Sequence, residues 1–272
     1  MSPQPFLTFH YHANAHVVGA TFSRPVQDLV EVQGATSLPS NGGHGRAAVQ
    51  DFRFQHFLSV KNGYSHVSGS PQEAPGKTHF TTLVTAVAEG VNILDVVTVD
   101  RIVARFASSH TLDHATGTFD DVEPNFSLLG SKFENLQIAG CKTDVEIDFR
   151  LFHNIPTFEK AIKEYKSNAE FKKMVEDPFE LKESWPDPEK SGAILCSVVN
   201  LKKMTTQCPG VDRKGHCFVI PKFGRLFLGE ILIEHGRRTL NMLRFELGSP
   251  VSASGTAIQL SSNGTPVPPP TR

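Results

Sequence analysis

Apolar and polar residues alternate with a period of two along several segments of the chain. From Leu7 to Val17 the odd positions are apolar, and most even positions carry polar side chains. A period of two puts successive side chains on opposite faces of a strand, so this segment predicts a strand with one buried side. The alternation recurs in residues 51–61, 101–106, 145–152 and 243–247. It places Phe52, Phe54 and Phe149 in the core.

Turn-forming clusters separate these predicted strands, as at Asn41-Gly42-Gly43, Asn62-Gly63 and His235-Gly236-Arg237. Alternating strands joined by such turns indicate a mainly β fold with antiparallel sheet. Several of the strands are long, which favours closure into an antiparallel β-barrel because a barrel leaves no open edges. A two-sheet sandwich is the alternative.

Residues 157–176 follow a different period. Phe158, Ile162, Tyr165 and Ala169 are spaced by four, three and four residues, which predicts one amphipathic helix. Thr157 is a suitable N-cap, and Pro178 ends the helix.

The domain organisation follows from these elements. We expect a single β domain over residues 1–261, with residues 154–191 as a helical and loop insertion between strands at 145–152 and 193–201. Residues 262–272 are rich in proline and predict a mobile tail.

Composition narrows the class of protein. The 272 residues include 27 Lys and Arg against 28 Asp and Glu, so no strong overall charge attracts nucleic acid. No stretch has the roughly 18 to 20 apolar residues of a transmembrane helix. Residues 1–16 show no signal-peptide pattern, which predicts a soluble cytoplasmic protein, or an exported one if the full protein carries a leader that this sequence lacks.

His10, His12 and His16 are the candidate metal ligands. A His-x-His pair on a strand projects both imidazoles to the same side, about 7 Å apart, a spacing that a strand-borne zinc site uses. The alternative interpretation is the water-facing side of a strand. A metal site needs a further ligand from a neighbouring strand.

Cys208 and Cys217 are the candidate thiol pair, facing one another across a hairpin and forming a disulfide only in an exported protein. All four cysteines are otherwise expected to be reduced.

Two short motifs fail as catalytic or nucleotide-binding signatures. Gly76-Lys77-Thr78 lacks the first glycine of a phosphate-binding loop, because Pro71 stands there. Gly63-Tyr64-Ser65-His66 is followed by Val67, where a nucleophile elbow requires glycine. No catalytic residue is nominated.

Three segments carry a resemblance to a known family. Residues 91–102, 131–140 and 220–230 resemble segments of the choice-of-anchor P family of bacterial surface proteins, whose hallmarks are F-x-N-L-x-V-N-G-like and P-G-x-G-x-V-x-L-N-E-like strands. The resemblance spans residues 13–247 apart from the insertion, and it implies an exported all-β protein of unknown function. Ala139 stands where the family has Asn.

These observations favour a non-enzymatic β protein that binds a small apolar ligand or a protein partner, with homo-oligomer formation as a further expectation. One alternative is an enzyme with a metal or acid/base site on the sheet, built on His10 and His12 or on His216. Another is a structural subunit that assembles through edge strands or the loop around Trp185.

Overall fold

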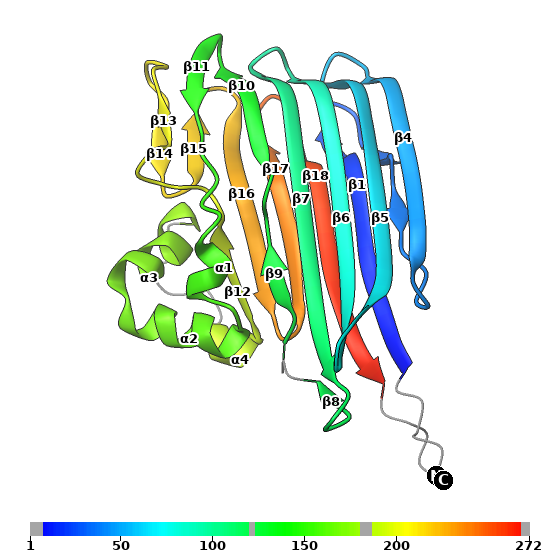
Figure 1. The fold of residues 1–272 in the computed structure, drawn as a ribbon. Coiled ribbons are helices and arrows are strands. Elements are labelled where there is room, and N and C mark those ends of the chain that lie inside the picture. Colours follow the sequence, from blue (N-terminus) through cyan, green and yellow to red (C-terminus); the bar gives the residue numbers. More distant parts are fainter. Residues whose placement is uncertain (1–7, 120–122, 180–186, 268–272) are drawn as a thin grey trace.

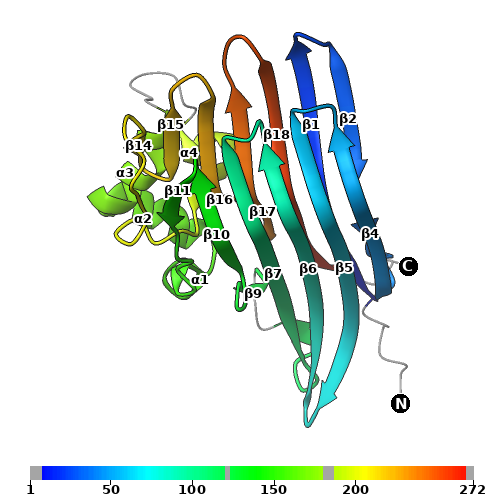
Figure 2. The same ribbon diagram turned by 90° about the horizontal axis from the view of Figure 1, so that it is seen from above.

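Two antiparallel sheets packed face to face make up the protein (Figures 1 and 2). The computed structural model describes residues 8–119, 123–179 and 187–267, and within these ranges each sheet has nine strands. Sheet A has the order β14 (Asp212–Lys214), β15 (Cys217–Ile220), β16 (Gly224–Glu234), β17 (Arg237–Leu247), β18 (Ser252–Val267), β1 (Thr8–Arg24) and β2 (Asp28–Gln33), with β12 (Ala193–Ser197) beside β16 and β3 (Thr36–Ser37) beside β1. Sheet B has the order β13 (Thr205–Thr206), β11 (Cys141–Asp144), β10 (Lys132–Ile138), β7 (Val97–Asp113), β6 (Lys77–Ile93), β5 (Leu58–Ala74) and β4 (Gly43–Phe54), with β8 (Thr118–Phe119) and β9 (Asn125–Ser127) beside β7.

The mainly β, antiparallel prediction is confirmed. The described strands form two separate sheets with edge strands, so they match the sandwich alternative and close no barrel. The space between the sheets is filled by the chain's own apolar side chains, such as Val17, Ile102 and Phe245, all fully buried.

The alternation predicted for the first strand is also confirmed. Phe9, Tyr11, Ala13, Ala15 and Val17 are buried, while the residues between them are partly or fully exposed. Strand β1 lies between β18 and the edge strand β2 in sheet A, and it packs on β5 and β6 of sheet B. Its apolar side is therefore part of the core between the sheets.

In sheet B, one residue from each of five neighbouring strands lies in a row across the sheet. On passing this row, the core-facing side chains of each strand change between odd-numbered and even-numbered positions. Register places Asp51, Lys61, Gly90, Asp100 and Asn135 side by side on β4, β5, β6, β7 and β10. Every second member has a positive φ, which is 48° at Asp51, 62° at Gly90 and 50° at Asn135. At the row, two successive residues of each strand therefore face outward, where strict alternation would allow only one, as in a β-bulge.

Sheet A has a matching row, which crosses Gly229, Met242, Ile258, Val17 and Gly34. Here φ is 61° at Gly229, Ile258 and Gly34, again on alternate strands or strand ends. The extra residue faces inward in this sheet, because successive residues are both fully buried on three neighbouring strands: Val17 with Val18, Met242 with Leu243, and Ala257 with Ile258.

The predicted turn at Asn62-Gly63 is wrong for the same reason. Both residues lie inside β5, next to the row residue Lys61. The turn-like composition marks the place where the strand switches its buried face, and the chain does not reverse there.

Helices occupy one side of the sandwich, next to β12 and β16 (Figure 1). They are α1 (Leu151–Asn154), α2 (Phe158–Ser167), α3 (Ala169–Glu176), the 3-10 turn η1 (Asp177–Phe179) and α4 (Pro188–Ser191). Thr157 caps α2 as predicted, with its hydroxyl accepting from the Lys160 amide. The single predicted helix is two, because the Asn168 side chain accepts from the amides of Glu170 and Phe171 and starts a new helix there. No helix in the described ranges is long and apolar enough to cross a membrane.

The predicted strand over 145–152 is wrong. Only Ile147 forms an isolated bridge, to Val199, and α1 begins at Leu151. The Asp148 carboxylate accepts from the Arg150 amide at 3.0 Å, a local turn that competes with a strand. Phe149, predicted in the core, is 45% exposed.

Phe52 and Phe54, by contrast, are partly buried and pack against the core. The predicted mobile tail is wrong for residues 262–267, which continue β18, while residues 268–272 lie outside the described ranges. Pro266 is tolerated because pairing of β18 with β17 ends at Ser262, so its missing N–H costs no bond on that side.

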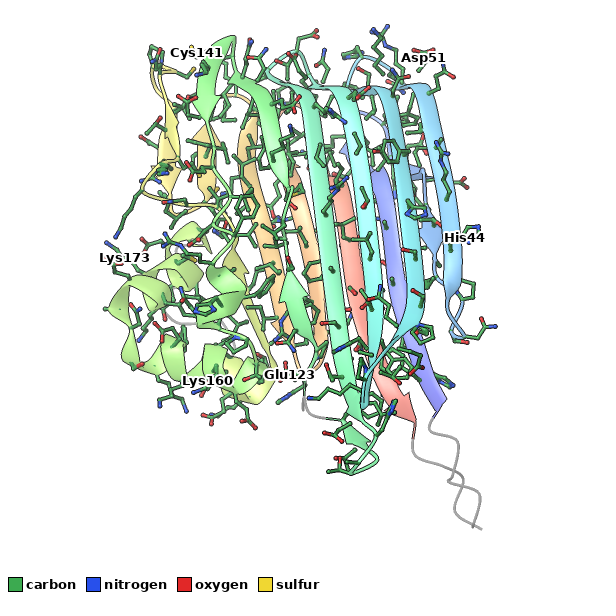
Figure 3. All side chains as sticks on the ribbon, in the orientation of Figure 1. His44, Asp51, Glu123, Cys141, Lys160 and Lys173 are labelled. Carbon is green, nitrogen blue, oxygen red and sulfur yellow. The ribbon has the colours of Figure 1, made fainter. Side chains whose placement is uncertain are left out.

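A buried ion pair joins both sheets to the helices. Arg238 on β17 donates from Nη2 to Glu123 Oε2 at 2.8 Å, and these side chains are 0% and 5% exposed. The Glu123 carboxylate also accepts from the Phe158 amide at 3.0 Å, at the first residue of α2. Figure 3 shows Glu123 near the helices, in the segment that leads from β8 to β9.

Phe106→Ala is expected to reduce the free energy of unfolding by about 3 to 5 kcal/mol, because it leaves a cavity at a fully buried position. Phe149→Ala is the matched control at an exposed phenylalanine and is expected to change it by about 0.5 kcal/mol or less. Urea denaturation of both variants measures the difference. Equal losses would contradict the assignment of the core.

Glu123→Gln is expected to reduce the free energy of unfolding by about 3 to 5 kcal/mol, because it leaves the Arg238 cation buried without its counter-charge. Glu234→Gln on the same β16–β17 hairpin removes a partly exposed carboxylate 3.9 Å from Arg237 and should cost less than about 1 kcal/mol. Denaturation at neutral pH compares the two, and a loss of under 1 kcal/mol at Glu123 would contradict the prediction.

Candidate functional site

A groove of about 490 Å³ lies on the outer face of sheet B. Register puts His66 of β5, Thr85 of β6 and Arg105 of β7 directly opposite one another, in one cross-strand row. Leu83 and Ala107 form the next row. The groove therefore has a polar row of hydrogen-bonding side chains beside an apolar one.

The wall of the groove is a turn that departs from the edge of β7. Strands β9 and β10 both pair with β7, but the chain between them turns outward at Leu128–Ser131, closed by a bond from the Ser131 amide to the Leu128 carbonyl at 3.0 Å. Gly130 takes φ +90°, as the third residue of a type II turn requires. Leu128 is buried and anchors the turn, while Leu129 is 69% exposed at the rim.

Ser131 fastens this turn to Arg105. Its hydroxyl accepts from the Arg105 amide at 2.9 Å and donates to the Arg105 carbonyl at 3.0 Å. A Cβ at Gly130 would lie 3.1 Å from Arg105 Cδ, so the arginine stem passes close to the turn. These contacts fix where the Arg105 side chain leaves the sheet.

The Arg105 guanidinium makes no ion pair or hydrogen bond with any residue in the described ranges, and no Asp or Glu lines the groove. Tyr64 and His66 on β5 add a hydroxyl and an imidazole to the same groove. An unpaired guanidinium binds carboxylate or phosphate through two parallel hydrogen bonds. The arrangement can hold an anionic head group beside the apolar Leu83 and Leu129.

The residues of this groove are hard to identify from the sequence alone, because the sequence does not show how the three strands pair. The segment 63–66 resembles only an incomplete nucleophile elbow, and Thr85 and Arg105 lie on other strands. Their one shared property is a position on the outward side of an alternating strand. Only pairing of the three strands brings them together.

The three candidate metal ligands lie on the outward side of β1, as predicted. His12 is exposed, and His10 and His16 are partly buried. His16 Nε2 lies 3.1 Å from the Thr256 hydroxyl, and burial lowers the pKa of His16 to about 4. No group of three or more His, Cys, Asp and Glu side chains in the described ranges could hold a metal ion. Zinc binding by these histidines stays a prediction.

The predicted pairing of Cys208 with Cys217 differs from the structure. Cys217 is buried in β15, opposite Phe227 and Lys214. Burial raises the pKa of Cys208, and its thiol has a hydrogen-bond contact with Cys141 that acts in the same direction. The nine-residue spacing misled the prediction because 208 and 217 are on separate strand pairs.

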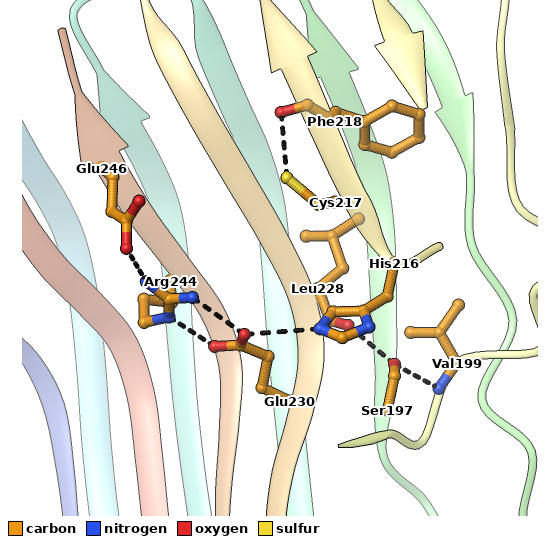
Figure 4. A network of polar contacts seen from close by, with 9 residues as sticks. All are labelled: Ser197, Val199, His216, Cys217, Phe218, Leu228, Glu230, Arg244 and Glu246. Atoms are coloured by element: carbon orange, nitrogen blue, oxygen red, sulfur yellow. Dashed lines mark hydrogen bonds and ion pairs between the residues drawn. The ribbon is translucent and has the colours of Figure 1, made fainter. Parts of the chain in front are cut away.

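A buried polar network lies on sheet A (Figure 4). His216 Nε2 is 3.3 Å from Glu230 Oε1, and Arg244 donates to both oxygens of Glu230, from Nε at 2.5 Å and from Nη2 at 2.9 Å. Burial alone would raise the pKa of Glu230, but hydrogen bonds from Arg244 and His216 hold it below its usual value. Arg244 also binds Glu246 and lies over the Phe227 ring.

This network is a poor candidate for catalysis. His216 and Glu230 are 0% and 1% exposed, so a substrate has no access to them. The nearby Cys217 has its pKa raised to about 12 by burial, which keeps the thiol protonated and unreactive. The network pairs buried charged groups with one another and leaves no site that a substrate could reach.

A second groove, of about 450 Å³, lies between the helices and residues 199–202. Its lining includes carboxylates and cations together, among them Glu170 and Lys202, whose charged groups are 3.7 Å apart. Because these charges can neutralise one another, this groove gives less selection for a charged ligand than the groove on sheet B.

Comparison with known proteins gives one match. The family model described as a domain of unknown function (DUF8256) matches residues 9–234. No curated protein and no solved structure matches the chain significantly.

Protonation of His16 is expected to make folding pH-dependent. Its pKa of about 4 in the folded state is below the ordinary 6.5, so between these values the unfolded chain takes up a proton that the folded chain does not. Stability contributed by neutral His16 is therefore present above pH 6.5 and lost as the pH falls towards 4, by up to about 3 kcal/mol.

His16→Gln should remove this part of the pH dependence, whereas His12→Gln, exposed on the same side of β1, should keep it. Urea denaturation at pH 7 and pH 4.5 measures both. An unchanged pH dependence in His16→Gln would contradict the prediction.

Proposed function

Since the chain belongs to the DUF8256 family, whose function is unknown, we propose its function from the geometry: it binds a small amphipathic anion in the groove on the outer face of sheet B. A carboxylate or phosphate head group binds Arg105 and His66, and a short apolar portion lies against Leu83 and Leu129. The observation that carries the proposal is the Arg105 guanidinium, which has no ion pair or hydrogen bond within the part of the chain that the structure describes, in a groove that no described carboxylate lines.

The size and lining of the groove support a small molecule. About 490 Å³ lies within the range of about 300 to 1,000 Å³ that is typical of ligand sites. Leu83 and Leu129 are 38% and 69% exposed, so a ligand chain would cover apolar surface that water now contacts. The proposal refines the expected apolar ligand to one with an anionic end, and puts it in an outer groove instead of a barrel interior.

The alternatives have weaker support. An acid/base enzyme would need access to His216, which is enclosed. An assembly subunit would pair through an edge such as β4, but the positive φ at Asp51 interrupts the regular hydrogen-bonding pattern of that edge. Trp185 lies outside the described ranges. Export, which the choice-of-anchor P resemblance implies, is untested by the family match.

Arg105→Gln is expected to weaken binding of hexanoate or hexyl phosphate by about 10-fold or more, because a hydrogen bond to a charged group contributes about 1.5 to 3 kcal/mol. Ligand-observed NMR titration of the purified protein measures the affinities. Hexanol tests the head group, and it should bind more weakly than either anion.

Arg101→Gln is the matched control, since Arg101 lies on the same side of β7, pairs with Glu89 at 3.3 Å and does not line the groove. It should bind both anions like the original protein. Equal affinities in the two variants, or no binding of either anion by the original protein, would overturn the proposal.

A further inference from the structure

Cys141 and Cys208 lie opposite one another at the edge of sheet B. Strands β11 and β13 pair antiparallel through Thr143 with Thr206 and Asp144 with Thr205. Two residues further along this register, Cys141 meets Cys208. Cross-strand neighbours have Cα atoms about 4.5 to 5.5 Å apart, within the range that a disulfide spans.

The side chains of the two cysteines share one face of the strand pair. Thr143 donates from its hydroxyl to the Thr206 hydroxyl at 3.1 Å, so these two side chains point to the same side. Residues two positions apart on a strand lie on the same face, which puts both thiols on that side as well. The hydrogen-bond contact between the two thiols agrees with this placement.

Access separates this pair from the other two cysteines. Cys141 and Cys208 are partly exposed, whereas Cys196 and Cys217 are fully buried. Burial also raises the pKa of both buried thiols to about 12, so almost no thiolate forms there at neutral pH. An oxidant in solution therefore reaches the pair at the sheet edge first.

We propose that Cys141 and Cys208 are a redox pair, which a low-molecular-weight disulfide such as oxidised glutathione converts into an intramolecular disulfide between β11 and β13. One cysteine thiolate attacks the glutathione disulfide, forms a mixed disulfide and releases one glutathione thiolate. The second cysteine thiolate then attacks the protein sulfur of the mixed disulfide and releases the second glutathione. Two protein thiols are oxidised, one glutathione disulfide is reduced to two thiols, and the two protons pass to the released glutathiones.

The bond would close a covalent loop that begins at the first residue of β11 and ends just after β13. Strand β13 has two residues, and its one partner among the described strands is β11. The chain between the two cysteines contains all the helices of the described ranges and β12. Figure 3 shows Cys141 at the end of β11 that is far from those helices. Oxidation would fix the start of this long segment to its end.

The test is incubation of the reduced, folded protein in glutathione redox buffers at pH 8, followed by alkylation and peptide mass spectrometry. The expected result is a linked peptide pair containing Cys141 and Cys208, with Cys196 and Cys217 alkylated only after unfolding. The melting temperature should rise by several degrees on oxidation and return on reduction, because a long loop is closed.

Cys217→Ser is the matched control and should still form the bond, whereas Cys208→Ser should not show the rise in melting temperature. Three results would overturn the proposal: a fully reduced protein in the most oxidising buffer, glutathione adducts that never resolve, or a linked pair that contains Cys217. The mass of the original protein, which falls by two hydrogens on bond formation, gives the answer even if a variant fails to fold.

Discussion

The contact between Arg238 and Glu123 is the constraint on which the helical side of the molecule depends. Arg238 belongs to sheet A, Glu123 to the segment that leads to β9 of sheet B, and the Phe158 amide to the start of α2. A carboxylate at a helix N-terminus is favoured by the helix dipole, so one buried group serves the guanidinium and the helix together. His235 Nδ1 lies 3.6 Å from the same carboxylate. Removing either charged partner leaves the other in a dry environment, which is why these elements meet in one arrangement.

Two arginines on the outer faces of the sandwich, Arg244 on sheet A and Arg105 on sheet B, differ in their counter-charge. On sheet A, Arg244 lies between Glu230 and Glu246, and its charge is balanced within the protein. On sheet B, Arg105 has no such partner in the described ranges. The Arg244 guanidinium lies over the Phe227 ring, and the stem of Arg105 passes close to the turn at Gly130. The difference in counter-charge decides which face can attract an external anion.

Much of the fold could be predicted from the sequence because one face of each long strand is buried, which makes apolar and polar residues alternate. Strand β1 shows this, since its alternation survives up to Val17. The prediction fails where local hydrogen bonding competes with the pattern, as at Asp148. It also fails where the row through Lys61 shifts the pattern by one residue, so that Asn62-Gly63 lies inside a strand and forms no turn. Site residues were harder to find. His66 and Arg105 are distant in sequence and meet only through strand pairing, and the partner of Cys208 also depends on register.

The pairing of β1 with β18 has a mechanical consequence. These strands are antiparallel neighbours, with Thr8 opposite Val267, so the two ends of the described chain lie at the same end of one strand pair (Figure 1). A pulling force applied at these two residues would load the ladder of hydrogen bonds one rung at a time, starting at Thr8. The two strands would therefore separate one hydrogen bond after another. They would resist such a force far less than terminal strands that are pulled in shear, where all the hydrogen bonds bear the load at once.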